Sequence, residues 1–174
     1  MPLPLVWLGA GAAALYAGTK LTREFQKSQG YIDHFPGECK RSVMPVDGAV
    51  VCCGIYEVFQ HTGIWVDNSI IELRGNGLIR GISPERFLEE RSGNTIFVAC
   101  DKSLRPLVNP NTAQAATSRI FEYSEYDLIS NNCHRFTMHC VTGGDRQITR
   151  FAELNAALLD AFGTKIYWQP IRTS

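Results

Sequence analysis

Short apolar runs alternate with turn residues through the middle of the chain, and this pattern predicts β-strands. The runs lie at residues 48–59, 61–66, 69–73, 78–82 and 94–100. Asp67 and Asn68 separate the second run from the third. Because Asp and Asn tolerate the positive φ angles of a two-residue turn, these two runs are expected to form an antiparallel hairpin.

Helical periodicity is concentrated after the strands. One helix is predicted to start with Ser83 as its cap and Pro84 as its first residue. Three more are predicted over residues 110–122 with Asn109 as the cap, over 132–142, and over 145–163. A run of strands followed by helices is typical of an α+β protein, so we expect an antiparallel sheet packed against helices.

The beginning of the chain has a different pattern. Residues 1–19 contain no charged side chain, and residues 3–18 are apolar enough to form a helix of roughly 24 Å. Lys20, Arg23 and Lys27 follow directly. Under the positive-inside rule, these cations place the following domain in the cytoplasm. We therefore expect a single-pass N-terminal membrane anchor, with a buried helix or an atypical signal peptide as the alternatives.

These patterns divide the chain into four parts. Residues 1–20 are the expected anchor, with an N-terminal hydrophobic helix, and residues 21–46 are a linker rich in charge, Gly and Pro. Residues 47–164 form the domain, and residues 165–174 form a C-terminal tail.

Charge and cysteine content limit the partners and cofactors that the sequence leads us to expect. Seventeen basic and seventeen acidic residues balance, so the sequence gives no reason to expect a nucleic-acid partner. Six cysteines are present without a C-x-x-C pair, and the expectation is no metal and no cofactor. Most of these cysteines are expected to be small buried apolar residues in a reducing compartment.

Cys133 is the exception, because it falls in the first turn of the helix predicted at 132–142. Asn131 or Asn132 is the expected N-cap and Gly143 the expected stop. Free N–H groups and the helix dipole at this position favour a thiolate and lower the thiol pKa from about 8.5. The alternative is that Cys133 only begins the buried stripe of the helix.

A thiolate nucleophile needs a base, and His61 is the best placed of the four histidines. It begins the strand at 61–66, whereas His134 and His139 are expected to be solvated on other faces of the helix. Glu72, on the hairpin partner of that strand, is the carboxylate expected to orient His61. The alternative for Glu72 is a strand residue that faces solvent.

Four stretches together resemble the lecithin:retinol acyltransferase-like (LRAT-like) family, a branch of the NlpC-type papain-like thiol enzymes with permuted order. They are Asp47-Gly48, "FQHTGIWV", "SRIFEYSEYDLISNNCHRF" and "VTGGDRQI", and the similar region covers about residues 46–149. The resemblance implies a permuted papain-like fold, with Cys133 as nucleophile and His61 as base. This chain departs from the family at Glu72, where a second histidine is usual, and at His134-Arg135, where an acidic residue and a histidine are usual.

The function implied by the resemblance is thioester chemistry on Cys133. The expected activity is that of a membrane-tethered acyltransferase or hydrolase (phospholipase A type), with lipid acyl esters as substrates and the membrane as partner through residues 3–18. Two alternatives are a thiol amidase or peptidase of the same fold, and an inactive binding or scaffold protein. Oligomeric state is not predicted.

Overall fold

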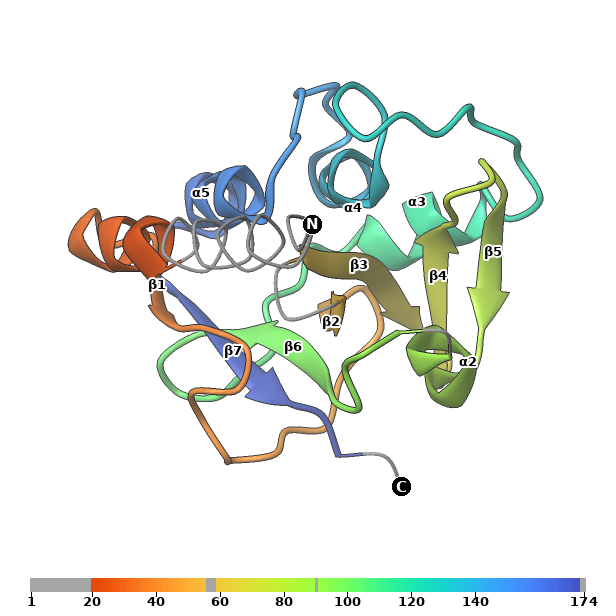
Figure 1. The fold of residues 1–174 in the computed structure, drawn as a ribbon. Helices are drawn as coiled ribbons and strands as arrows, with labels where there is room; N and C mark the ends of the chain where they lie inside the picture. Colours follow the sequence, from red (N-terminus) through yellow and green to blue (C-terminus); the bar gives the residue numbers. More distant parts are fainter. Residues whose placement is uncertain (1–19, 56–58, 90, 173–174) are drawn as a thin grey trace, which may run out of the picture.

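The computed structural model describes residues 20–55, 59–89 and 91–172, and these residues form a mixed α+β fold. A seven-stranded sheet with the order β1-β7-β6-β2-β3-β4-β5 lies at its centre (Figure 1). Its strands are β1 (Ile32–His34), β2 (Val50–Ile55), β3 (Phe59–Val66), β4 (Ser69–Leu73), β5 (Ile79–Ile82), β6 (Ile96–Cys100) and β7 (Ile166–Pro170). Only the pair of β1 and β7 is parallel among these strands, which confirms the predicted mostly antiparallel sheet.

The predicted hairpin between β3 and β4 is confirmed. Asp67 and Asn68 have φ angles of 47° and 54°, as a two-residue turn of this kind requires. The turn sets Ile64 opposite Ile71, and therefore Gly63 opposite Glu72. A Cβ atom at Gly63 would lie 2.6 Å from the Ile70 side chain and 2.8 Å from the Ile71 carbonyl oxygen, so only glycine fits this crossing.

Four helices have bounds within the described residues. They are α2 (Pro84–Leu88), α3 (Thr112–Thr117), α4 (Cys133–Thr142) and α5 (Phe151–Phe162). Helices α3, α4 and α5 lie on one side of the sheet, whereas α2 lies on the other side (Figure 1). Each side has its own apolar core, so the sheet is buried on both faces near its centre. The predicted cap of α2 is confirmed, because the Ser83 side chain accepts a hydrogen bond from the backbone N–H of Arg86.

The helix predicted over 110–122 is shorter than expected. Its cap is Asn111 rather than Asn109, and no side-chain hydrogen bond caps it. Beyond Thr117 the backbone turns to the sheet: the N–H of Phe121 donates to Ile79, and the N–H of Ile79 donates to Glu122. Phe121 has a φ of 72°, which a helix does not allow. Pairing with the start of β5 therefore replaces the last helical turns.

The segments predicted as a linker and a tail both contribute to the fold. Residues 20–28 are helical and β1 follows within the expected linker, while β7 occupies half of the expected tail. Five residues are a short sequence signal for a strand, and burial of the whole Trp168 side chain against α5 favours the strand here. The helix predicted over 145–163 likewise begins only at Phe151, with Arg150 as its N-cap.

The predicted membrane anchor lies outside the described residues. In the part of the chain that the structure describes, no helix has both the length and the apolarity needed to cross a bilayer.

Candidate active site

Asn132 fixes the start of α4. Its side-chain oxygen accepts hydrogen bonds from the backbone N–H groups of His134 and Arg135, at 2.9 and 3.0 Å. Its amide nitrogen donates to the carbonyl oxygens of Leu128 and Ile148. These bonds confirm Asn132 as the N-cap and hold Cys133 at the first helical position. Gly143 ends the helix with a φ of 70°, as predicted.

Cys133 is buried, with a relative exposure of 4%. Its sulfur lies 3.9 Å from Nδ1 of His134, and the charge of His61 and a hydrogen bond with its ring also act on the thiol. Burial raises the pKa of the thiol, but the charges and hydrogen bonds of these two histidines outweigh burial and bring the pKa well below its ordinary value. The environment therefore favours the thiolate that nucleophilic chemistry requires.

His61 and Glu72 meet as predicted. Nε2 of His61 lies 2.7 Å from Oε2 of Glu72, and both side chains lie on the same face of the sheet, on the adjacent strands β3 and β4. The alternative of a solvent-facing Glu72 is wrong, because its relative exposure is 0%. A carboxylate only accepts hydrogen bonds, so Nε2 of His61 carries the proton and Nδ1 is left for Cys133.

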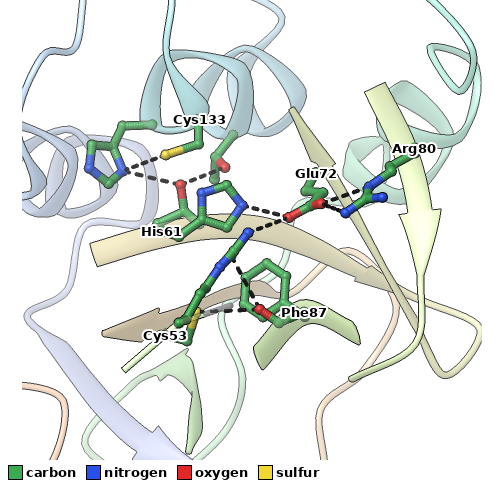
Figure 2. Close-up of polar contacts among 10 residues, drawn as sticks. Cys53, His61, Glu72, Arg80, Phe87 and Cys133 are labelled. Atoms are coloured by element: carbon green, nitrogen blue, oxygen red, sulfur yellow. Dashed lines mark hydrogen bonds and ion pairs between the residues drawn. The ribbon is translucent and has the colours of Figure 1, made fainter. Parts of the chain in front are cut away.

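Two arginines that the sequence analysis did not identify hold Glu72 from the other side. Arg80, directly opposite on β5, donates to Oε1 from Nε and Nη2, both at 2.9 Å (Figure 2). Arg91, which follows α2, donates to Oε2 from Nη2 at 3.1 Å. Burial raises the pKa of Glu72, but its bond to His61 and the two arginines outweigh burial and hold the pKa below its usual value.

The same network acts on His61. Burial lowers the pKa of its imidazole, yet the charge of Cys133 and the hydrogen bonds to Cys133 and Glu72 outweigh burial, and the pKa is raised. Its ring packs against Phe87 of α2, with 5.2 Å between the ring centroids. A raised imidazole pKa beside a lowered thiol pKa is the condition for an imidazolium–thiolate pair.

His134 is not solvated, contrary to expectation. Its relative exposure is 7%, and its ring lies near that of Phe151 on α5. Nδ1 lies 3.1 Å from the hydroxyl of Thr62 on β3, and that hydroxyl is also 3.1 Å from the hydroxyl of Thr137 on α4. The prediction failed because α4 is covered on several sides, by the sheet, α3 and α5. His139 is only partly buried, and its Nδ1 lies 3.2 Å from the carbonyl oxygen of Gly144.

Tyr126 lies beside the nucleophile on the segment between α3 and α4. Its phenol group interacts with both the sulfur and the backbone N–H of Cys133. Burial is the main cause that raises the pKa of the phenol, and the charge of Cys133 adds to it. A protonated phenol is a hydrogen-bond donor, so Tyr126 offers its O–H near the sulfur.

No group of three or more His, Cys, Asp or Glu side chains suited to a metal ion occurs in the described ranges. The six cysteines are all free thiols. No family model matches the chain, and neither the curated proteins nor the solved structures contain a significant match. The chemical interpretation of the site therefore rests on its geometry.

The residues that the sequence analysis missed come mostly from less regular segments. Arg91 and Tyr126 lie outside the strands and helices, and their distances along the chain give no sign of their position. Arg80 had a usable signal, because pairing of the strands predicted at 69–73 and 78–82 places a basic residue near Glu72.

Proposed function

We propose that this protein is a cysteine-dependent acyltransferase or hydrolase that forms a thioester on Cys133. The observation that carries the proposal is the continuous series from Glu72 through His61 to the sulfur of Cys133 at the start of α4. A buried carboxylate, an oriented imidazole and a thiol of lowered pKa are the three groups that covalent acyl transfer uses.

In the first half-reaction, Nδ1 of His61 takes the thiol proton and the sulfur attacks the acyl carbonyl carbon. The carbonyl oxygen becomes an oxyanion, for which the Cys133 backbone N–H and the Tyr126 hydroxyl are the donors at hand. When the ester C–O bond breaks, the His61 imidazolium gives its proton to the leaving oxygen. The acyl group remains on sulfur as a thioester.

In the second half-reaction, water, an alcohol or an amine attacks the thioester. His61 removes a proton from the attacking group, and the sulfur leaves as the thiolate. Glu72 holds the His61 tautomer throughout, and the two arginines hold Glu72 ionised. A hydrolase and an acyltransferase differ only in the group that accepts the acyl chain.

Two features support lipid acyl esters as the substrate class. The segment that leads from α3 to Cys133 exposes large apolar side chains: Phe121 at 83%, Leu128 at 73% and Ile129 at 64%. Such side chains are suited to contact with acyl chains. The expected anchor at residues 3–18 would also hold the domain beside a bilayer.

We further propose a permuted papain-like fold for the domain. The order of the site residues supports it, because the histidine strand β3 precedes the nucleophile helix α4 in the chain. The placement of the thiol at a helix start and of the imidazole on a strand is consistent with the same proposal.

The test is incubation with phosphatidylcholine vesicles, followed by mass spectrometry of the lipids and of the intact protein. Wild type should release lysophospholipid and gain an acyl mass on Cys133, and Cys133→Ala should do neither. His139→Asn, a change on the same helix away from the sulfur, is the matched control and should retain activity. If only peptide substrates acylate Cys133, the activity is that of an amidase and lipid esters are not the substrate class. No acylation by either class would refute the proposal.

Membrane attachment has a separate test. Deletion of residues 1–19 should move the protein from floated vesicles to the soluble fraction, because the apolar segment is lost. Flotation of the shortened protein at the level of the full chain would contradict an anchor in this segment.

A further inference from the structure

Two histidines, rather than one, contact the sulfur of Cys133, and they come from different elements. His61 reaches it from β3 and is oriented by Glu72. His134 reaches it from α4 itself, with Nδ1 at 3.9 Å from the sulfur. The catalytic series of Glu72, His61 and Cys133 does not use this second imidazole.

The surroundings of His134 differ from those of His61 in one decisive respect. No carboxylate is seen at its ring among the described contacts; instead Nδ1 faces the hydroxyl of Thr62 at 3.1 Å. A hydroxyl both donates and accepts, and Thr137 at 3.1 Å from Thr62 supplies the complementary partner in either arrangement. The threonine pair therefore accommodates Nδ1 of His134 with or without a proton.

We infer that His134 is a second proton acceptor and donor for the Cys133 sulfur. When the S–H bond breaks, its proton forms an N–H bond at Nδ1 of His134, and the sulfur keeps the electron pair. The Thr62 hydroxyl then changes from donor to acceptor. The proton returns to the sulfur by the same path. This inference rests on the proposed role of Cys133 as the nucleophile.

The consequence is a division of work between the two imidazoles. In the free protein His134 shares the thiol proton with the sulfur and stabilises the thiolate. His134 returns this proton to the sulfur, and His61, held by Glu72, then takes it and gives it to the leaving oxygen. Burial of the His134 ring strengthens its interaction with the sulfur, since little water lies between the groups.

Other ionisable groups also face this part of the site and contribute to its pH dependence. They are His61 on β3, Glu72 on β4, Cys52 and Cys53 on β2, Tyr126 before α4, and Arg91 after α2. From α5 the neighbour is the uncharged ring of Phe151. A test must therefore isolate His134 from these groups by a change that alters its proton chemistry alone.

His134→Asn meets this need, because the amide keeps a polar atom near the position of Nδ1 but takes up no proton. The measurement is the rate of alkylation of Cys133 by iodoacetamide against pH, followed by mass spectrometry of the peptide that contains it. At a pH where the thiol is still mostly protonated in both proteins, His134→Asn should react about tenfold more slowly than wild type, the change expected for one unit of thiol pKa. His139→Asn should match wild type.

The outcomes separate this inference from the proposed function. A wild-type Cys133 that reacts no faster than a free thiol at about pH 6 overturns the proposed function and this inference with it. A reactive wild type with equal pH profiles for His134→Asn and His139→Asn overturns only the role of His134. A profile shifted to higher pH in His134→Asn alone supports it.

A second measurement does not depend on the folding of a His134 variant. Nitrogen NMR of the imidazole rings should show His134 changing its protonation together with Cys133 in the wild type. In Cys133→Ala this change should disappear. Identical His134 signals in both proteins between about pH 4 and pH 9, the range in which imidazole and thiol ordinarily ionise, would overturn the inference.

Discussion

Two clusters of buried and partly buried polar side chains lie on the same sheet, but they differ in charge. The charged cluster contains His61, Glu72, Arg80 and Arg91 and lies on β3, β4, β5 and the segment after α2. The amide cluster contains Gln26, Asn155 and Trp168 and joins the first helical segment, α5 and β7.

The amide cluster is a structural connection. The Asn155 side chain donates to Gln26 at 3.1 Å and accepts from the indole N–H of Trp168 at 3.0 Å. None of the three side chains ionises, and all are buried. The charged cluster instead ends at a thiol whose pKa it changes. A buried polar cluster without ionisable groups therefore indicates a role in stabilising the fold. Ionisable groups beside a nucleophile instead indicate a role in its reactivity.

The largest effect should come from His61→Ala. Loss of the base should lower kcat/KM for acyl transfer by about 10²–10⁴-fold, the usual contribution of general acid–base catalysis. Steady-state release of lysophospholipid checks this. The matching change in the other cluster, Asn155→Leu, should leave the specific activity of the folded protein near wild type. Equal losses of activity in both would remove the distinction between the clusters.

Glu72→Gln should affect stability and activity together. It removes the charge that pairs with His61, Arg80 and Arg91, which should cost about 2–4 kcal/mol at pH 7. Folding lowers the pKa of Glu72, so its stabilising effect is present above the unfolded pKa of about 4.3 and is lost as pH falls through the folded value. Urea unfolding should therefore show a smaller gap between variant and wild type in acid. If the difference in unfolding free energy between variant and wild type were larger in acid, the stabilising role of these ion pairs would be contradicted.

Asn155→Leu should lower stability by about 1–3 kcal/mol, because the Trp168 N–H and the Gln26 oxygen lose their partner in the interior. Thermal or urea unfolding measures this loss. Alkylation of Cys133 at neutral pH should be unchanged in the folded protein. A shifted thiol pKa in this variant would show that the two clusters are coupled.

Asp145→Asn should have the smallest effect. Asp145 pairs with Arg135, two residues after the nucleophile, but its side chain is exposed. Exposed ion pairs contribute less than about 1 kcal/mol. Urea unfolding should therefore differ little from wild type, and the pH profile of Cys133 alkylation should coincide with it. A shifted profile would show that the exposed pair of Asp145 and Arg135 also affects the pKa of the Cys133 thiol.

The sequence allowed prediction of the parts of the fold that depend on local patterns. The strands at 61–66 and 69–73 are rich in β-branched and aromatic residues, and the Asp67-Asn68 turn sets their register, so the meeting of His61 and Glu72 followed from local rules. The start of α4 was predictable for the same reason, since Asn132 and Gly143 are strong cap signals.

Other features depend on contacts between distant segments and were not predictable in this way. Residues 118–122 have helical composition, but Phe121 and Glu122 pair with the start of β5, and β7 gains its stability from packing against α5. His134 looked solvated because the helix was considered alone. Its burial comes from Thr62 and Phe151, which approach α4 from separate parts of the chain.

The place of β7 in the sheet has a consequence for synthesis of the chain. Among the described strands, β1 pairs only with β7, which the ribosome makes about 130 residues later. Until then one edge of β6 also lacks its partner. Until β7 is made, the nascent domain therefore has an unpaired β1 and an open edge on β6, and we expect chaperone binding or misassociation to be concentrated at the stage before β7 is inserted.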